Sequence, residues 1–413
     1  MINNYIKLAL KVLGRRKFFT FISLFGISLT LVVLMVAVAI MDNLFAARQP
    51  ESRFDRVLAV HVMGLYGPRG GMTSMPGYAF VKKYMFDLPG IENQSVFTIQ
   101  TPMVMYHEGK KIESHVRRTD GAYWQILDFK FLEGGAFTEQ DNVDAKFVAV
   151  INADMREKLF GGAPAVGKSF ELEGQRYRVV GVVENVAFTR RVGFSEVWAP
   201  IRTLKDRSYE TLMSHSFGGI VLAKSQADFP RLRREFQQRL TSYRFDDPQS
   251  FNRVIAGLDT GFEAAARNIV GNNVEKDRAA ILRTALAVMA LLFILLPTMN
   301  LVSINLSRIM ERASEIGVRK AFGASSRTLI GQFVVENIVL TAIGGTIGFL
   351  LSILVLRAIS SIDLVPYLEF DVNLRIFGYG MLMAVIFGIF SGVYPAWRMA
   401  RMHPVNALRG GAL

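Results

Sequence analysis

Four apolar segments, each 20 or more residues long, limit what this 413-residue chain can fold into. They are residues 18–41, 284–307, 328–356 and 376–397. The first, second and fourth segments contain no charged residue, and the third contains only one, Glu336. A helix needs about 20 residues to cross the hydrocarbon core of a bilayer. The sequence therefore predicts an α-helical integral membrane protein with four transmembrane helices.

The distribution of basic residues predicts how these helices are oriented. The stretches 1–17, 308–327 and 398–413 together hold 13 basic and two acidic residues, in a chain whose formal charge is +13. Lys and Arg collect on the cytoplasmic side of membrane proteins. We therefore expect both termini and the 308–327 loop in the cytoplasm, with residues 42–283 and the short loop 357–375 outside. The positive charge then reports membrane orientation, and no nucleic acid is expected as a partner.

The segment 42–283 is long enough for a large extracytoplasmic α+β domain. Alternating apolar and polar residues predict strands at 57–62, 96–106, 111–117, 147–151, 176–183, 196–201, 218–223 and 250–256. Helical periodicity predicts helices at 78–86, 154–160 and 228–240, and a helical stalk at 259–283. The order of these elements predicts two subdomains, in which residues 131–205 form a second subdomain inserted into the first.

The string GGAPAVGKS at 161–169 satisfies the phosphate-binding pattern G-x-x-x-x-G-K-[ST] through Gly162, Gly167, Lys168 and Ser169. A true P-loop joins a buried strand to a following helix, whose N-terminus holds the phosphates. Here a short helical stretch precedes the string, and two alternating stretches follow it. This order predicts a turn that leads into a hairpin, and the domain also lies outside the nucleotide pool. We therefore interpret the string as structural and expect no cofactor on this chain.

Small residues recur every four positions in two of the spans. They are Gly344 and Gly348 in the third span, and Gly380, Ala384, Gly388 and Gly392 in the fourth. Small residues let membrane helices approach each other closely. They predict helix-packing faces, either within one chain or between two chains.

Two other residues interrupt the apolar pattern of the spans. Pro297 predicts a kink in the second span, which would be either a hinge or a static bend. Glu336 lies among spanning residues, and acids inside a membrane are candidates for a functional role. The alternative is a structural hydrogen bond between Glu336 and Asn300, Asn305 or a serine of the second span.

The first 17 residues have their own pattern. Asn4, Lys7, Lys11 and Arg15 form one polar stripe, which predicts an amphipathic helix in the interface of the membrane. An ordinary basic flank is the alternative. The apolar stretch that follows is longer than the core of a signal peptide, so we expect it to remain as a membrane anchor.

Three stretches resemble the MacB/FtsX-type permeases of ABC transporters. They are ERASEIGVRKAFGAS at 311–325, QFVVENIVLTAIGGTIGF at 332–349 and YPAWRMARMHPVNALRGG at 394–411. In addition, LFGGAPAVGKSFELEGQRYRVVGVVEN at 159–185 is similar to part of the periplasmic core domain that these permeases carry. The resemblance implies a bacterial inner-membrane protein with four spans per subunit, a periplasmic domain of two subdomains, and a dimer.

The resemblance also implies that the cytoplasmic loop forms a coupling helix that contacts an ATPase. The residues concerned are Glu311, Arg312, Glu315, Ile316, Gly317, Arg319, Lys320 and Gly323. A Glu at the position of Glu336 is common in the family. MacB carries a fused ATPase domain before its first span, whereas 17 residues precede the first span here. We therefore expect ATP and Mg to be bound by a separate ATPase subunit.

These features predict a permease subunit that couples ATP hydrolysis by a cytoplasmic ATPase to movement of its periplasmic domain (mechanotransmission). Efflux or export of a periplasmic peptide, drug or lipid-linked molecule is the expected activity. The expected partners are the ATPase, a second permease copy or a paralogue, membrane lipid and a periplasmic adaptor. A lipoprotein-releasing permease and an FtsX-like activator of periplasmic enzymes are alternatives within the family.

Two other classes of protein are considered. A membrane-anchored receptor or sensor is disfavoured because the cytoplasmic segments hold no signalling domain. An extracytoplasmic enzyme is disfavoured because the sequence has no HExxH and no G-x-S-x-G motif. No metal site is expected either, because the five histidines lack metal-binding spacing. These are His61, His107, His115, His215 and His403.

Overall fold

The computed structural model describes residues 2–292, apart from 16, 108, 246 and 272–276, and residues 325–362. Beyond these it describes residues 318, 322, 366, 367, 370 and isolated positions between 374 and 389. The chain forms two compact units. The helical unit comprises Met1–Asn43, Thr284–Leu364 and Glu369–Leu413, and the α+β unit comprises Leu44–Arg283 and Val365–Leu368. Each unit is described by itself.

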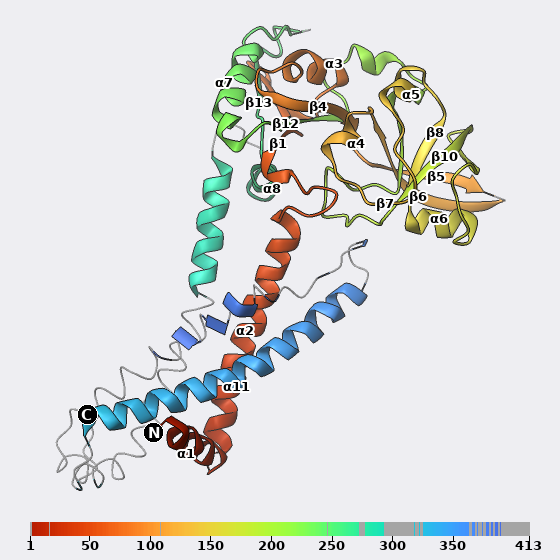
Figure 1. The fold of residues 1–413 in the computed structure, drawn as a ribbon. Coiled ribbons are helices and arrows are strands. Elements are labelled where there is room, and N and C mark those ends of the chain that lie inside the picture. Colours follow the sequence, from red (N-terminus) through yellow and green to blue (C-terminus); the bar gives the residue numbers. More distant parts are fainter. Residues whose placement is uncertain are drawn as a thin grey trace. The chain divides into compact units, whose positions relative to one another are not determined.

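The described helices of the helical unit include α1 (Ile2–Arg15), α2 (Lys17–Phe45) and α11 (Ser326–Ser361), and residues 284–292 of this unit are also helical (Figure 1). Stretches of α2 and α11, Thr20–Phe45 and Val334–Ser361, are long and apolar enough to cross a membrane. The helix α11 begins where Ser325 caps it, since the Ser325 hydroxyl accepts a hydrogen bond from the amide of Thr328 at 3.2 Å. The second and fourth predicted spans lie largely outside the described residues.

Buried apolar side chains join α1, α2 and α11. Leu13 of α1, Ile27 and Leu31 of α2, and Leu340 of α11 form one cluster. The opposite side of α2 exposes large apolar side chains, including Phe18, Phe21, Phe25 and Leu29. Such a surface would be costly in water and is typical of a helix that faces lipid.

The described residues of the α+β unit form 13 strands and several short helices. The strands are β1 (Val57–Val60), β2 (Met63–Gly67), β3 (Gly70–Ser74), β4 (Ile91–Thr98), β5 (Thr101–His107), β6 (Lys110–Thr119), β7 (Phe131–Gly134), β8 (Val148–Asn152), β9 (Ser169–Leu172), β10 (Gln175–Val183), β11 (Val197–Pro200), β12 (Phe217–Ala223) and β13 (Arg253–Ala256). The α-helices are α3 (Tyr78–Phe80), which continues as a π-helix (Val81–Met85), α4 (Tyr123–Ile126), α5 (Glu139–Val143), α6 (Ala153–Phe160), α7 (Phe229–Leu240) and α8 (Gly261–Val270), and residues 278–283 are also helical. Four 3₁₀ turns cover Phe54–Arg56, Ile201–Thr203, Ser208–Glu210 and Gln226–Asp228.

Six strands of the larger sheet pair in a ring. The order β6-β11-β8-β10-β9-β5 closes because β5 also pairs with β6. The strands β4, β12 and β1 extend this sheet from β6, and β7 pairs with β10. The ring encloses a buried apolar core that includes Ile151, Leu172 and Val179, and Met155 and Leu159 of α6 cover it.

The other half of the α+β unit has a separate core. Here the buried side chains of α7 (Leu232, Phe236 and Leu240) pack with those of the β1 and β12 strands and the helix at Tyr78–Met85. A small second sheet has the strand order β13-β2-β3. It is linked to the larger sheet along the chain, because β2 directly follows β1. The expected stalk at 259–283 is divided, because α8 ends at Val270 and the next residue, Gly271, has a φ of 122°, which is outside the helical region.

Most expected elements of the α+β unit are present, and three further differences concern its strands. The strand expected at 96–106 is two strands, since the chain bends after Thr98 so that β4 and β5 both pair with β6. The hairpin β2–β3 was not expected, because four glycines between 64 and 71 hide its alternation. The ring includes β5 and β6, so its boundary differs from the predicted block 131–205. A separate subdomain over 131–205 stays a prediction.

Candidate functional site

The P-loop-like string lies between α6 and the β9–β10 hairpin. Gly161 and Gly162 have φ values of 60° and 76°, which end the helix in a left-handed turn. The amide of Gly167 donates to the Val179 carbonyl at 2.9 Å, and the amide of Lys168 donates to the Ala165 carbonyl at 3.0 Å. These two amides, which a P-loop would present to phosphates, are used inside the protein. We keep the structural interpretation of this string.

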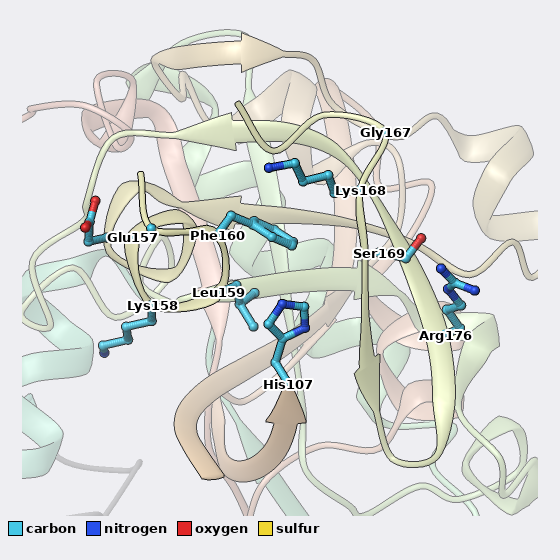
Figure 2. Close-up of a pocket in the computed structure, with 10 residues that line it drawn as sticks. His107, Glu157, Lys158, Leu159, Phe160, Gly167, Lys168, Ser169 and Arg176 are labelled. Atoms are coloured by element: carbon cyan, nitrogen blue, oxygen red, sulfur yellow. The ribbon is translucent and has the colours of Figure 1, made fainter. Parts of the chain in front are cut away.

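A shallow cavity of about 610 Å³ adjoins the string (Figure 2). Figure 2 shows Phe160 between Lys168 and His107. The Lys168 ammonium lies 5.1 Å from the Phe160 ring centre, and the His107 ring meets Phe160 edge-on at 5.3 Å. The cavity lies at the C-terminal end of α6, where the helix dipole disfavours an anion. Its geometry therefore gives no support for nucleotide binding.

Buried polar residues lie along α11. Glu336 has 2% of its surface exposed, and Gln332, Asn337, Thr341 and Ser352 are also buried. A carboxyl group at this depth in an apolar helix is costly unless the surrounding residues bind it. Asn300 and Asn305, two of its predicted partners, lie outside the described residues. The choice between a functional and a structural role for Glu336 therefore stays open.

Gly344 and Gly348 lie where α11 crosses α2. The Ser28 hydroxyl donates to the Gly344 carbonyl at 2.8 Å. A Cβ atom on Gly348 would lie 2.9 Å from the Ser28 carbonyl oxygen, and one on Gly344 would lie 2.9 Å from the Ile27 side chain. The close neighbours of both glycines belong to the same chain. Gly380, Ala384, Gly388 and Gly392 lie outside the described residues.

The predicted coupling helix is not described either. Glu311, Arg312, Glu315, Ile316, Gly317, Arg319, Lys320 and Gly323 all lie outside the described residues, as does Pro297. Within this stretch the structure describes Val318, which is 45% exposed, and Phe322, which is 88% exposed. The role of these residues stays a prediction.

Buried charged side chains in the α+β unit were missed by the sequence reasoning. Arg117 and Arg118 point to opposite faces of β6, and both are buried. Arg117 donates to the carbonyl oxygens of Phe194 and Thr98, each at 3.2 Å. Arg118 donates to the Tyr177 hydroxyl at 2.9 Å. Arg117 therefore ties β6 to β4 and to the loop before β11, whereas Arg118 ties β6 to β10, a strand of the ring that does not pair with it.

Asp120 follows β6 and is also buried. Its carboxylate accepts hydrogen bonds from the Ser95 hydroxyl at 2.6 Å and from the Val96 amide at 3.0 Å. Burial raises the pKa of Asp120 to about 6, although these hydrogen bonds act in the opposite direction. Asp120 thus fixes the end of β6 against β4.

A buried charge pair involves Glu51, just after α2, and Arg190. Their closest atoms, Glu51 Oε2 and Arg190 Nη1, are 3.6 Å apart. Glu51 also accepts hydrogen bonds from the amides of Val192 at 3.2 Å and Gly193 at 3.0 Å. Burial raises the pKa of the Glu51 carboxyl, whereas Arg190 and the amides act to lower it. No sequence signal identified this pair, since an isolated Glu and Arg are typical of exposed loops.

Within the described residues, no group of three His, Cys, Asp or Glu side chains could hold a metal ion. Comparison with known proteins places the chain. The family model of the MacB-like periplasmic core domain matches residues 20–239, and the model of the FtsX-like permease C-terminal region matches residues 287–404. The chain belongs to the MacB/FtsX-type permease family.

Two relatives represent this permease family. The chain is 25% identical over 328 residues to an uncharacterized ABC transporter permease, YknZ, of Bacillus subtilis, covering 78% of this chain and 76% of the relative. It is 24% identical over 416 residues to the macrolide export ATP-binding/permease protein MacB of Escherichia coli K12, covering 98% of this chain and 60% of that protein. A crystal structure of the extracellular domain of YknZ matches with 19% identity and a TM-score of 0.36, covering 48% of this chain and 98% of that domain.

The two family models and the two relatives confirm the resemblance found in the sequence. The chain is a membrane permease of the ABC transporter class with a MacB-like periplasmic domain of α+β fold. The α+β unit contains most of the residues matched by the periplasmic core domain, from Leu44 onward. Four transmembrane helices and two subdomains stay predictions.

Proposed function

We propose that this permease couples ATP hydrolysis by a separate cytoplasmic ATPase to movement of its periplasmic domain. The observation that carries the proposal is that two family models of ABC permeases together match most of the chain, one over the α+β unit and one over the C-terminal spans. In this proposal ATP and Mg bind to the ATPase subunit, and this chain supplies no catalytic residue. The protein lies in a bacterial inner membrane, with both termini and the 308–327 loop on the cytoplasmic side.

The described helices support a mechanical role. The helices α2 and α11 are joined by the hydrogen bond from Ser28 to the Gly344 carbonyl and by close contact at Gly348. Two helices that pack this closely move together more easily than they separate. Within the described spans Glu336 is the one buried charged side chain, which is not what a polar path for a solute would require. We infer that the work is done on a periplasmic molecule.

The expected activity is efflux or export of a periplasmic peptide, drug or lipid-linked molecule. MacB of Escherichia coli, which this chain resembles at 24% identity, is described as a macrolide exporter. The expected assembly contains two permeases, either identical copies or paralogues, together with membrane lipid and a periplasmic adaptor. An FtsX-like activator of periplasmic enzymes is the second candidate, because the C-terminal model is FtsX-like.

Co-purification with a charge-reversed variant tests the proposal. The wild-type permease, extracted in mild detergent, should bring down an ATPase whose activity it stimulates. The double variant Arg312→Glu with Glu315→Arg should lose this stimulation at least about tenfold, because the charges that would contact the ATPase are inverted. Arg234→Glu, which changes an exposed residue of α7, is the matched control and should leave stimulation unchanged. Stimulation that survives in the double variant would contradict the coupling assignment.

A further inference from the structure

The short connector after α11 contributes to the α+β unit. Residues Val365–Leu368 belong to that unit, and α11 ends at Ser361. The Tyr367 hydroxyl lies 2.7 Å from Asp154 Oδ2 and 2.8 Å from Glu196 Oε1. The amide of Phe188 donates to the Pro366 carbonyl at 3.1 Å. The connector is therefore held by both its backbone and its side chain.

The charges around Tyr367 come from several elements of the ring. Asp154 belongs to α6, and Glu196 directly precedes β11. The Lys158 ammonium lies 2.6 Å from Asp154 Oδ2 and 3.5 Å from Glu196 Oε1. On the other side, the amide of His115 donates to Glu196 Oε2 at 2.7 Å. Tyr367 thus inserts its hydroxyl between two carboxylates that Lys158 bridges.

These contacts are of a strong kind. A hydrogen bond to an ionised carboxylate is shorter and stronger than one between neutral groups. The phenol has one hydrogen to donate, so it serves one carboxylate while Lys158 offsets the charge of the pair. Burial lowers the pKa of Lys158, but its bonds to Asp154 and Glu196 outweigh this and raise it, which keeps Lys158 charged.

The backbone of Tyr367 is itself unusual. Its φ is 57°, in the left-handed region that a bulky residue rarely adopts. Such a conformation persists where the surrounding contacts determine it, and it is concentrated at functional positions. Here those contacts are the bonds of the hydroxyl and the packing of the ring near Phe194, at 6.5 Å between ring centres.

The loop that contacts the connector after α11 also contacts the chain segment that follows α2. We define the receiving loop as residues 184–196. Arg190 of this loop donates to the Ala46 carbonyl at 2.7 Å and pairs with Glu51. Phe188 and Glu196 of this loop bind the connector after α11. The receiving loop therefore contacts two chain segments, and each of them lies only a few residues from a membrane-spanning helix.

We propose that the receiving loop fastens the periplasmic domain to two transmembrane helices, and that Tyr367 is the positioning residue for α11. Glu196 directly precedes β11, and Asp154 lies just after β8. A displacement of the connector therefore acts on β11 and β8, which pair with each other in the ring. The inference rests on the proposed function, since the ATPase is the source of the movement. Glu51 and Arg190 form the corresponding attachment for α2.

The attachment is tested by hydrogen exchange on the full chain in detergent. Tyr367→Phe removes the hydroxyl and keeps the ring, so the bond from Phe188 to Pro366 should open more often. We expect exchange of the Phe188 amide to become about ten times faster, while amides of β8 keep their protection. Tyr106→Phe, which removes the hydroxyl of an exposed tyrosine on β5, is the matched control and should exchange as wild type. Unchanged exchange at Phe188 in Tyr367→Phe would overturn the inference.

Transmission is tested on the permease purified with its ATPase. In wild type, a non-hydrolysable ATP analogue should change exchange in β8 and β11. Tyr367→Phe should keep the ATPase bound but reduce this change at least about threefold, which a merely structural role would not do. A full response in Tyr367→Phe would overturn the inference and leave the proposed function intact. If no ATPase accompanies even the wild type, the proposed function fails, and the exchange at Phe188 decides on the attachment alone.

Discussion

Asp120 shows how burial changes the chemistry of one residue. Its carboxylate is surrounded by donors from Ser95 and Val96, yet burial raises its pKa to about 6, from an ordinary value of 3.8. The folded state therefore binds the proton of Asp120 more tightly than the unfolded state. This contribution to stability is greatest below about pH 4 and falls as the pH rises through 6.

We predict that Asp120 makes the α+β unit roughly 1 kcal/mol more stable at pH 5 than at pH 7. Asp120→Asn should remove this part of the pH dependence, because an amide does not titrate. The measurement is urea unfolding at both pH values of the full chain carrying Trp397→Phe, followed by the emission of the two remaining tryptophans, Trp124 and Trp198. The same pH difference in wild type and variant would contradict the raised pKa.

Single residues differ in how far the sequence reveals them. Glu336 was found because it is the only charge in a long apolar segment. Arg117 and Arg118 were not found, because strand alternation predicts that one of two neighbours is exposed, whereas both are buried here. Tyr367 was also missed, since its partners are more than 170 positions away in the sequence.

Among the elements, the crossing of α2 and α11 depends on a glycine. A Cβ atom on Gly348 would lie 2.9 Å from the Ser28 carbonyl oxygen, which belongs to the backbone and cannot turn away. Gly331 lies on the same helix and would have no atom within 4 Å of a Cβ. The two glycines are therefore a matched pair for substitution.

We predict that Gly348→Ala destabilises the helical unit by about 1–3 kcal/mol, because α2 and α11 must move apart. Gly331→Ala should change stability by no more than about 0.5 kcal/mol. The measurement is the temperature at which heating the detergent-solubilised protein abolishes its monodisperse peak in size-exclusion chromatography. Equal losses for the two variants would show that Gly348 does not lie in a close contact.

Element type was largely predictable from sequence, and pairing was not. The hairpin β9–β10 followed from alternation around Glu173 and Gly174, whose φ values of 53° and 71° suit a tight turn. The ring did not follow, because periodicity reports which face of a strand is buried but not which strand is its neighbour. The join of β5 to β9 is a contact between distant parts of the chain.

For the whole molecule, the central prediction is the orientation in the membrane. The chain contains no cysteine, so single cysteines can report it without further changes. Arg234→Cys places a thiol on the exposed side of α7, and Phe322→Cys places one in the loop before α11. In spheroplasts, a membrane-impermeant maleimide should label the first at once and the second only after permeabilisation. The reverse result would contradict both the orientation and the proposed function.

The circular pairing of six strands also limits how other proteins can bind to this region. A foreign peptide can extend a sheet only where a strand has a side with free amides and carbonyls. Within the described ring, the weakest junction is that of β5 with β9, which rests on the single pair Tyr106 and Glu171. Elsewhere around the ring each strand already pairs with a strand on both sides. A binding partner must therefore be recognised there by loops and side chains. If the ring ever admits an additional strand, it does so at this seam.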